Sequence, residues 1–260
     1  MTSMSPFPVL FIGHGNPMNA IEDNEHHRCW AALGQQLPRP AAVLCISAHW
    51  ETRGTWVTGT DRPETIHDFY GFPKPLFDVR YLAPGDPALA TRIAGMAAAG
   101  TIRVDPGRGL DHGAWSVLRA MYPAADIPVV QLSLDMTLSG AAHYALAKQL
   151  APLRDENILI LGSGNIVHNL GLFHFHSDEE PAWAVRFQMQ VNGLIANRNH
   201  TALQNFGDLG ADAAAAIPTA EHYLPVLYAL AAQRDDDRAA LLNDRIISAI
   251  SMTSVLIETP

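Results

Sequence analysis

Residues 43–49 of the chain read VLCISAH, a short apolar run that ends in a small residue and a histidine. The same pattern occurs twice more, as VLFIGH at 9–14 and as LILGSGNIVH at 159–168. Runs that are apolar throughout are typical of central strands in a parallel sheet, which helices cover on both faces. The three segments therefore predict one sheet with histidines near the carboxyl ends of its strands.

Around these runs, short β-branched segments alternate with longer Ala- and Leu-rich ones. This alternation predicts an α/β fold with a central, mostly parallel (mixed) sheet flanked by helices on both faces. We expect strands at Pro8 to Ile12, Ala41 to Ser47, Thr55 to Thr60, Thr101 to Asp105, Pro128 to Leu134, Asn157 to Gly162 and Ser251 to Ile257. We expect helices at Glu22 to Leu37, Pro87 to Ala99, Ala114 to Tyr122, Ser139 to Arg154, Pro181 to Asn197 and Thr219 to Gln233.

Length and composition predict one domain over residues 1–260, because 48% of the 260 residues are apolar and no linker or repeat divides them. The net charge of −9 disfavours nucleic acid and anionic membranes as partners and favours a small molecule. The N-terminus lacks a basic region before its apolar run, so we expect a cytoplasmic protein. Cys29 and Cys45 form no CxxC pair and are expected to be reduced. The sequence has no identifiable exposed apolar stripe, so the oligomeric state stays open.

The stretch from Glu51 to Pro87 is rich in Pro, Gly and aromatic residues. A long irregular segment in a compact domain usually has a binding role, so we interpret it as a wall or lid over the site. A charged stretch at 234–238 (RDDDR) is interpreted as a solvated turn. The aromatic residues of the lid either pack together or form a flat slot for an aromatic ring; they are Phe69, Tyr70, Phe72, Phe77 and Tyr81.

His14, His49 and His168 are the histidines that follow the three apolar runs, and His222 in TAEHYLP offers a fourth imidazole. Ligands of open α/β sheets bind at the carboxyl ends of the strands, so these side chains are expected at one rim. Neutral imidazole is a common ligand for zinc and iron. A single histidine at a strand end more often packs than binds metal, but three delivered by one topology favour a metal site. Their spacing does not identify the metal.

His112 in GLDHGAW precedes a predicted helix, and the neighbouring Asp111 could orient its ring. It is a candidate acid/base or substrate-binding residue, or else a helix cap. His67 in TIHDFYGFP lies on the lid and either reaches a ligand or is an exposed loop residue. The glycine-rich LGSGN at 161–165 lacks the nucleophile-elbow, Walker and dinucleotide patterns and is interpreted as a tight turn that aims His168. No role is assigned to His26, His27, His143, His174, His176 and His200, with 174–176 as a less favoured ligand pair.

Seven ordered segments, spread over almost the whole chain, resemble the DOPA 4,5-dioxygenase-type branch of the class III extradiol ring-cleavage dioxygenase family. They are GHGNPMNA, ISAHW, TIHDFYGFP, LDHGAWSVL, VVQLSLD, SGNIVHNL and PTAEHYLPVLYAL. The resemblance implies that His14, His49 and His222 are metal ligands. It implies that His168 is a fourth metal neighbour or a catalytic acid/base, and that His112 and His67 lie near the substrate. A glutamate fills the third ligand place in the wider class, whereas here that place holds histidine.

The resemblance further implies an oxidoreductase that cleaves a catechol ring, such as that of DOPA at the 4,5 bond, with dioxygen to a muconic semialdehyde-type product. One divalent metal is expected, Fe(II) for ring cleavage or Zn(II), because an all-histidine set suits either ion. His168 is the first choice for the acid/base and His112 the second. Two other functions remain open: a zinc-dependent hydrolase, and a non-enzymatic scaffold like the Memo-type proteins, which resemble this class in fold.

Overall fold

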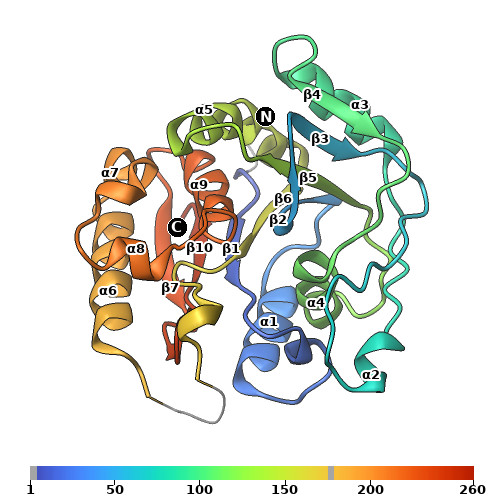
Figure 1. The fold of residues 1–260 in the computed structure, drawn as a ribbon. Coiled ribbons are helices and arrows are strands. Elements are labelled where there is room, and N and C mark those ends of the chain that lie inside the picture. The colour runs from blue at the N-terminus through green and yellow to red at the C-terminus, as the bar shows by residue number, and fades with distance from the viewer. Residues whose placement is uncertain (1–4, 175–178) are drawn as a thin grey trace.

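One eight-stranded sheet organises the computed structural model, which describes residues 5–174 and 179–260 (Figure 1). The strand order is β4-β3-β5-β2-β6-β1-β10-β7, and β8 pairs with β9 in a separate ribbon. The strands are β1 (Val9–Gly13), β2 (Ala42–Thr52), β3 (Thr55–Thr58), β4 (Ile102–Asp105), β5 (Val129–Asp135), β6 (Ile158–Gly164), β7 (Arg238–Leu242), β8 (Ile246–Ile247), β9 (Ile250–Ser251) and β10 (Ser254–Glu258).

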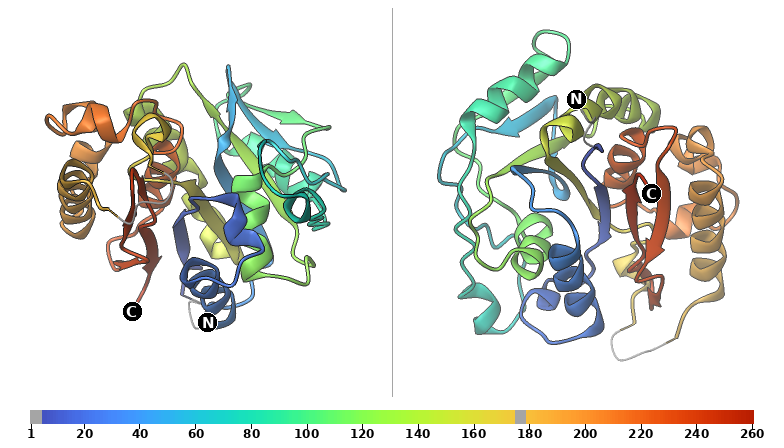
Figure 2. Two further views of the ribbon diagram at one scale, coloured as in Figure 1. Left: turned by 60° about the horizontal axis from the view of Figure 1, so that its bottom comes forward. Right: turned by 180° about the vertical axis from the view of Figure 1, so that it is seen from behind.

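The centre of the sheet is parallel. Strand β6 pairs in parallel with both β1 and β2, and β2 pairs in parallel with β5. Towards the edges the pairing is mixed, since β10 is antiparallel to β1 and β7, and β3 is antiparallel to β5. The right-hand view of Figure 2 shows β10 and β7 beside β1. Because β1, β2 and β6 run in one direction, the residues that follow them reach the same edge.

Side chains that alternate along the central strands fill two separate cores. Leu44 and Ile46 of β2 belong to the core that packs against α3, α5, α6 and α9, whereas Val43 and Cys45 face the core beneath α1 and α4. Burial on both faces explains why these strands have no polar alternation. The α/β class with helices on both faces is therefore confirmed.

The helices are α1 (Glu25–Gln36), α2 (Lys74–Phe77), α3 (Pro87–Met96), α4 (His112–Met121), α5 (Gly140–Leu150), α6 (Ala182–Ala196), α7 (His200–Gln204), α8 (Ala213–Ala216) and α9 (Leu224–Ala231). Several begin at a polar side chain that accepts a hydrogen bond from a backbone N–H of the first turn, as at Asn24, Asp86, Asp111 and Ser139. Short 3₁₀ turns occupy Pro17–Ala20, Ala151–Glu156, Leu170–Leu172 and Phe206–Asp208.

Several elements differ from the sequence-based predictions, since α2, α7, α8 and β8 lie where none was predicted. The predicted turn at 234–238 is not wholly solvated, because Asp237 is buried, and its last residue begins the edge strand β7, whose Ala-rich composition gives a weak β signal. The last predicted strand is split into β9 and β10. The helix expected from Thr219 begins only at Leu224, because Thr219 donates to Glu221 and residues 221–223 form a turn.

The stretch between β3 and α3 is irregular apart from α2, as expected for a wall of the site. Cys29 and Cys45 are both free. Among the residues that the structure describes, no helix is both long enough and apolar enough to cross a membrane.

Candidate active site

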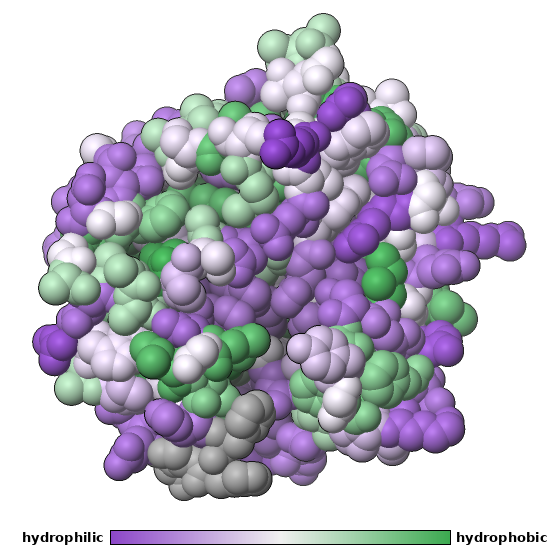
Figure 3. Space-filling model, in the orientation of Figure 1, coloured by the Kyte–Doolittle hydropathy of each residue, from purple (hydrophilic) through white to green (hydrophobic). Residues whose placement is uncertain are grey.

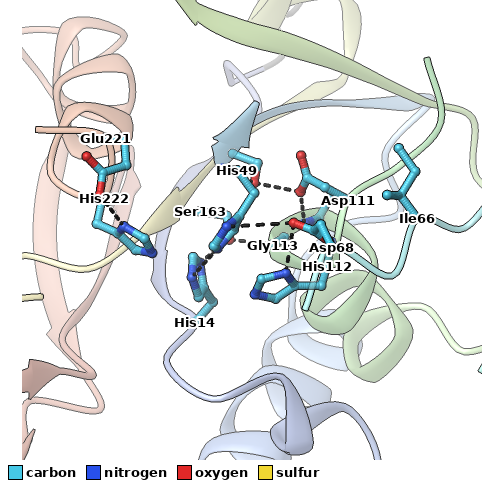
Figure 4. A network of polar contacts seen from close by, with 12 residues as sticks. His14, His49, Ile66, Asp68, Asp111, His112, Gly113, Ser163, Glu221 and His222 are labelled. Atoms are coloured by element: carbon cyan, nitrogen blue, oxygen red, sulfur yellow. Dashed lines mark hydrogen bonds and ion pairs between the residues drawn. The ribbon is translucent and has the colours of Figure 1, made fainter. Parts of the chain in front are cut away.

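Three histidines from distant parts of the chain meet at the carboxyl edge of the sheet (Figure 4). The ring centres of His14 and His49 lie 5.0 Å apart, and those of His222 lie 5.3 Å from His14 and 5.0 Å from His49. His14 follows β1, His49 lies on β2, and His222 precedes α9. The predicted convergence of these three imidazoles therefore exists in the structure. In the same orientation as Figure 1, Figure 3 shows hydrophilic residues lining a hollow near the middle of this face.

The tautomer of His14 follows from its hydrogen bonds. The ring is buried, and Nδ1 lies 2.9 Å from Oγ of Ser163 on β6. The Ser163 hydroxyl donates its single hydrogen to the carbonyl of Gly113 at 2.6 Å. A hydroxyl has only one hydrogen, so Ser163 accepts the N–H of His14 Nδ1. His14 therefore presents the lone pair of Nε2 to the site.

The second imidazole, His49, faces that lone pair directly, since the two Nε2 atoms are 3.1 Å apart. On the other side of its ring, Nδ1 lies 3.7 Å from Oδ2 of Asp68, which favours a proton on Nδ1. In the metal-free chain a hydrogen on one of these nitrogens would join them, and a bound cation would take its place. Ligands bound about 2.1 Å from one zinc or similar ion can stand at such a separation. The residues present therefore fit a divalent metal.

His222 is held from behind in the same manner. Its Nδ1 lies 3.2 Å from Oε1 of Glu221, and Figure 4 shows the ring pointing toward His14 and His49. The backbone is fixed by β6, because Asn165 N–H donates to the His222 carbonyl at 2.8 Å. A Cβ on Gly164 would lie 2.1 Å from that carbonyl oxygen. The glycine at 164 is therefore required for close approach to His222, whereas the sequence analysis interpreted LGSGN as a tight turn.

His168 stacks on His222, with ring centres 3.4 Å apart and planes 6° from parallel. Its backbone is tied by an N–H bond to the Ala216 carbonyl and by a β-bridge to Ile250. Together with Glu221 and His222 it forms one group of close potential ligand atoms. Burial lowers the pKa of His168 to about 4, so the ring is neutral near pH 7.

The metal-facing imidazoles share this neutral state. Burial, followed by the nearby histidines, lowers the pKa values of His14, His49 and His222 well below 6.5. Neutral rings have a free lone pair, which is the form that binds a metal ion. The electrostatics of the apo-protein therefore favour metal binding at neutral pH.

His112, the first residue of α4, lies on the opposite side of His14 and His49 from His222 (Figure 4). Its ring packs 3.9 Å from that of His49, centre to centre, and His14, His49 and His112 form a second group of close potential ligand atoms. Oδ2 of Asp68 lies 3.0 Å from His112 Nδ1, and Oδ1 accepts the His112 backbone N–H at 2.9 Å. His112 is thus placed in the site as predicted.

The carboxylate beside His112 is not the one that the sequence indicated. Asp111 caps α4 by accepting from Ala114 N–H, and it also accepts from Ser47 Oγ at 2.7 Å. Its carboxylate is wholly buried in these contacts, and burial raises its pKa. The expectation that Asp111 orients the His112 ring is therefore wrong, because Asp68 occupies that position.

His67 is farther from the centre than expected for a direct ligand. Its Nε2 lies 3.1 Å from the Val79 carbonyl, and its ring packs against Phe69, Phe77 and Trp115. Phe69 in turn contacts His112, with ring centres 5.5 Å apart. His67 thus belongs to an aromatic wall one layer behind His112.

Of the lid aromatics named in the sequence analysis, Phe69, Phe72 and Phe77 gather in this wall. Tyr70 is 92% exposed, and Tyr81 is buried in the core, where its hydroxyl donates to the Tyr122 carbonyl. The aromatic slot is therefore smaller than the five-residue cluster expected.

The remaining histidines that the structure describes lie outside the metal-facing group. His143 is fully buried against the Tyr228 hydroxyl rather than on a polar helix face, and His26 is also buried. His174 is described, but His176 lies outside the described residues.

Sequence reasoning missed Asp68 and Ser163, which anchor the Nδ1 sides of the imidazoles. Asp68 follows His67 directly within TIHDFYGFP, and Ser163 lies within the glycine-rich LGSGN. Both are polar residues inside segments already singled out. The sequence marks these segments, but it does not indicate which histidine either residue faces.

Comparison with known proteins agrees with this geometry. The family model described as the catalytic LigB subunit of aromatic ring-opening dioxygenase matches residues 8–255. A protein of Escherichia coli (strain K12) named 4,5-DOPA dioxygenase extradiol is 44% identical, over 98% of this chain and 96% of its own length. A protein of the same name from Beta vulgaris is 38% identical, over 91% of this chain and 90% of its own length.

A crystal structure of an uncharacterized protein from Escherichia coli K12 superposes with a TM-score of 0.84 at 41% identity, covering 96% of this chain and 99% of that one. The family match spans nearly the whole chain, including each of the histidines described above. The chain therefore belongs to the family of the catalytic LigB subunit of aromatic ring-opening dioxygenases.

Proposed function

We propose that this enzyme opens the ring of a catechol by extradiol cleavage with dioxygen, at a single divalent metal held by His14, His49 and His222. The observation that carries the proposal is the common arrangement of the three rings. Each has its Nδ1 side against an oxygen, from Ser163, Asp68 or Glu221. The carboxylate–histidine–metal arrangement of many metal sites uses such partners to aim the other nitrogen at the ion.

The ring spacings support His222 over His112 as the third ligand. Imidazoles bound about 2.1 Å from one ion, at a roughly right or tetrahedral angle, stand about 5 Å apart, centre to centre. The three pairs among His14, His49 and His222 are separated by 5.0 to 5.3 Å. His112 packs only 3.9 Å from His49, which is the spacing of neighbouring rings rather than of two ligands.

The bound metal would supply a Lewis acid that eases loss of the catechol protons and a centre for dioxygen activation. Ring cleavage requires a redox-active ion, so we propose Fe(II) as the working metal; Zn(II) suits the same ligands but has no redox chemistry. His168 stacks on His222 with ring centres 3.4 Å apart, which supports a place beside the metal rather than a direct bond to the same ion.

Proton transfer during cleavage requires a ring that can carry a proton at the substrate. Asp68 places negative charge 3.0 Å from Nδ1 of His112, which leaves Nε2 of His112 as the nitrogen that faces the substrate. This geometry supports His112 as the acid/base, whereas the low pKa of His168 favours its neutral form.

The substrate is proposed to be a small catechol whose ring lies beside the aromatic wall. Phe69 lies next to His112 and offers a flat apolar surface for such a ring, with His67 packed behind it. Two similar relatives are named as 4,5-DOPA dioxygenases, which supports DOPA as the first substrate to test. The net charge of −9 supports a small molecule rather than nucleic acid as the partner. We also propose a cytoplasmic location.

The test is to load the apo-protein with Fe(II) under anaerobic conditions, add DOPA or simple catechol, and admit air. We expect oxygen consumption in step with a coloured muconic semialdehyde-type product. Zinc-loaded protein is the matched control and should consume no oxygen, since Zn(II) is not redox-active. Iron-loaded protein that keeps its metal but consumes no oxygen with either substrate would contradict the proposal.

A further inference from the structure

We propose that Asp68 is a positioning residue that fixes the proton of His112 on Nδ1, so that Nε2 of His112 faces the reaction centre. The inference deepens the proposed function and rests on it for its consequence in turnover. Its structural part, the tautomer of His112, stands on contacts within the chain alone.

The two oxygens of Asp68 have separate partners. Oδ1 accepts the backbone N–H of His112 at 2.9 Å, which ties the lid segment to the first turn of α4. Oδ2 lies 3.0 Å from Nδ1 of His112 and 3.7 Å from Nδ1 of His49. Figure 4 shows the carboxylate beside these two rings. One oxygen thus holds the backbone, and the other is shared by two side chains.

A carboxylate accepts hydrogen bonds but cannot donate them, so it favours the tautomer that carries hydrogen on the facing nitrogen. The contact to His112 Nδ1 is short, although its N–H direction is not that of a well-formed hydrogen bond. Contacts of this kind often tighten when the substrate binds.

No other carboxylate in the described part of the chain is paired with these two rings. Asp111, next to His112 in sequence, faces Ser47 and the N-terminus of α4 instead. Glu221 lies against His222 on the far side of the cluster. The tautomer of His112 therefore depends on Asp68, whereas that of His49 also depends on its contact with Nε2 of His14.

Asp68→Asn separates positioning from loop anchoring. The amide oxygen can still accept the His112 backbone N–H, but the NH2 group then faces Nδ1 and donates to it. The substitution therefore keeps the anchor and reverses the tautomer preference of His112, placing hydrogen on Nε2. If Asp68 served only as an anchor, Asp68→Asn would behave as wild type.

The first readout is nitrogen NMR of the histidine-labelled apo-protein at about pH 8, above the ordinary imidazole pKa. The His112 signal is assigned by its loss in His112→Gln. We expect hydrogen on Nδ1 of His112 in wild type and on Nε2 in Asp68→Asn. Wild-type protein with hydrogen on Nε2 of His112 would overturn the proposal without recourse to any variant, and so would an unchanged tautomer in Asp68→Asn.

The second readout is turnover of the iron-loaded enzyme. We expect Asp68→Asn to lower kcat by about 10- to 100-fold with little change in KM, as for other residues that orient catalytic groups. Asp78→Asn is the matched control, because Asp78 lies in the same segment but is exposed and paired with Lys74. Equal kcat values for Asp68→Asn and Asp78→Asn would overturn the inference. Loss of oxygen uptake in wild type would instead contradict the proposed function, while the NMR result would stand.

Discussion

Two buried polar clusters lie at opposite edges of the same parallel strands. At the amino edge, Arg154 precedes β6 and pairs with Asp237, and both side chains are wholly buried. Arg154 also donates to the carbonyls of Phe7 and Ala232, and Asp237 accepts from Arg234 N–H and from Thr259. At the carboxyl edge, the histidines are anchored on one side only.

The two clusters differ in how their buried polar groups are paired. Every charge of the Arg154–Asp237 pair has a partner within the chain, so the cluster ties the first and last segments of the sheet together. At the carboxyl edge, the Nε2 atoms of His14 and His49 pair with each other, 3.1 Å apart. Both atoms belong to a group of close potential ligand atoms, and imidazole nitrogens gathered in this way can be shared by a metal ion. The amino edge thus holds the fold, and the carboxyl edge is arranged for a metal.

His14→Ala is the substitution with the largest expected effect at the carboxyl edge. Removal of one ligand should cost more activity than the roughly 10- to 100-fold loss seen for outer-shell residues, and it should abolish tight metal binding. The free energy of unfolding of the apo-protein should change by less than about 1 kcal/mol or rise, because functional sites are often not optimised for stability. Metal analysis and denaturant unfolding check both. A full metal equivalent in the variant would remove His14 from the ligand set.

Asp237→Ala should have the opposite profile. It leaves the buried guanidinium of Arg154 without its counter-charge, and such losses typically lower the free energy of unfolding by about 3–5 kcal/mol. The folded fraction should still bind one metal ion. Asp155→Ala is the control, since Asp155 pairs with Arg234 at the surface and its removal should cost less than about 1 kcal/mol. Equal stability of the two variants would show that the amino edge does not hold the fold in this way.

The sequence was sufficient for the parallel centre of the sheet, because β1, β2 and β6 are buried on both faces and their apolar runs are continuous. It was also sufficient for the histidines at the strand ends, since strand direction alone carries His14 and His49 to one edge. Strand β7 was missed for the opposite reason. An edge strand is half exposed, so its composition carries little β signal.

The partners of the histidines could not be predicted because they depend on side-chain contacts between remote segments. Asp111 is adjacent to His112 in sequence, yet the turn into α4 directs its carboxylate to Ser47. Asp68 reaches His112 from a segment 44 residues away. Sequence neighbours are therefore a poor guide to which carboxylate orients a ring.

Acid should affect the two edges at different pH values. The pKa of His168 falls from 6.5 to about 4 on burial, so the unfolded chain takes up a proton that the folded chain does not. The contribution of His168 to the free energy of unfolding of the apo-protein is fully present above about pH 6.5. Up to about 3 kcal/mol of it should be lost as the pH falls to about 4. Burial would raise the pKa of Asp237, but the hydrogen bond from Arg154 outweighs it and lowers the pKa below 3.8, so its contribution is lost only in stronger acid.

Denaturant unfolding at a series of pH values measures this difference. His168→Gln should make the decline between about pH 6.5 and 4 less steep, because one of the four buried histidines with a lowered pKa is gone. Identical slopes for wild type and His168→Gln would assign the acid sensitivity to other groups.

The smallest expected effect tests whether an anchor at the carboxyl edge serves the metal or the fold. Ser163→Ala removes the acceptor of His14 Nδ1–H and the donor to the Gly113 carbonyl. Leaving such buried groups unpaired should cost about 1–3 kcal/mol of stability, and release of the ring should weaken metal binding by about 10-fold.

Ser133→Ala is the matched control within the same sheet. Ser133 is a buried hydroxyl on β5 that accepts from Trp56 N–H at 2.8 Å and contacts Thr52 Oγ1, with no histidine among these partners. We expect a comparable loss of stability and an unchanged metal affinity, measured by competition with a chromophoric chelator. If both variants weakened the metal alike, the effect of Ser163 would be general loosening of the sheet. A loss of metal affinity confined to Ser163→Ala would show that both serine hydroxyls stabilise the sheet, but that only Ser163 also fixes a metal ligand.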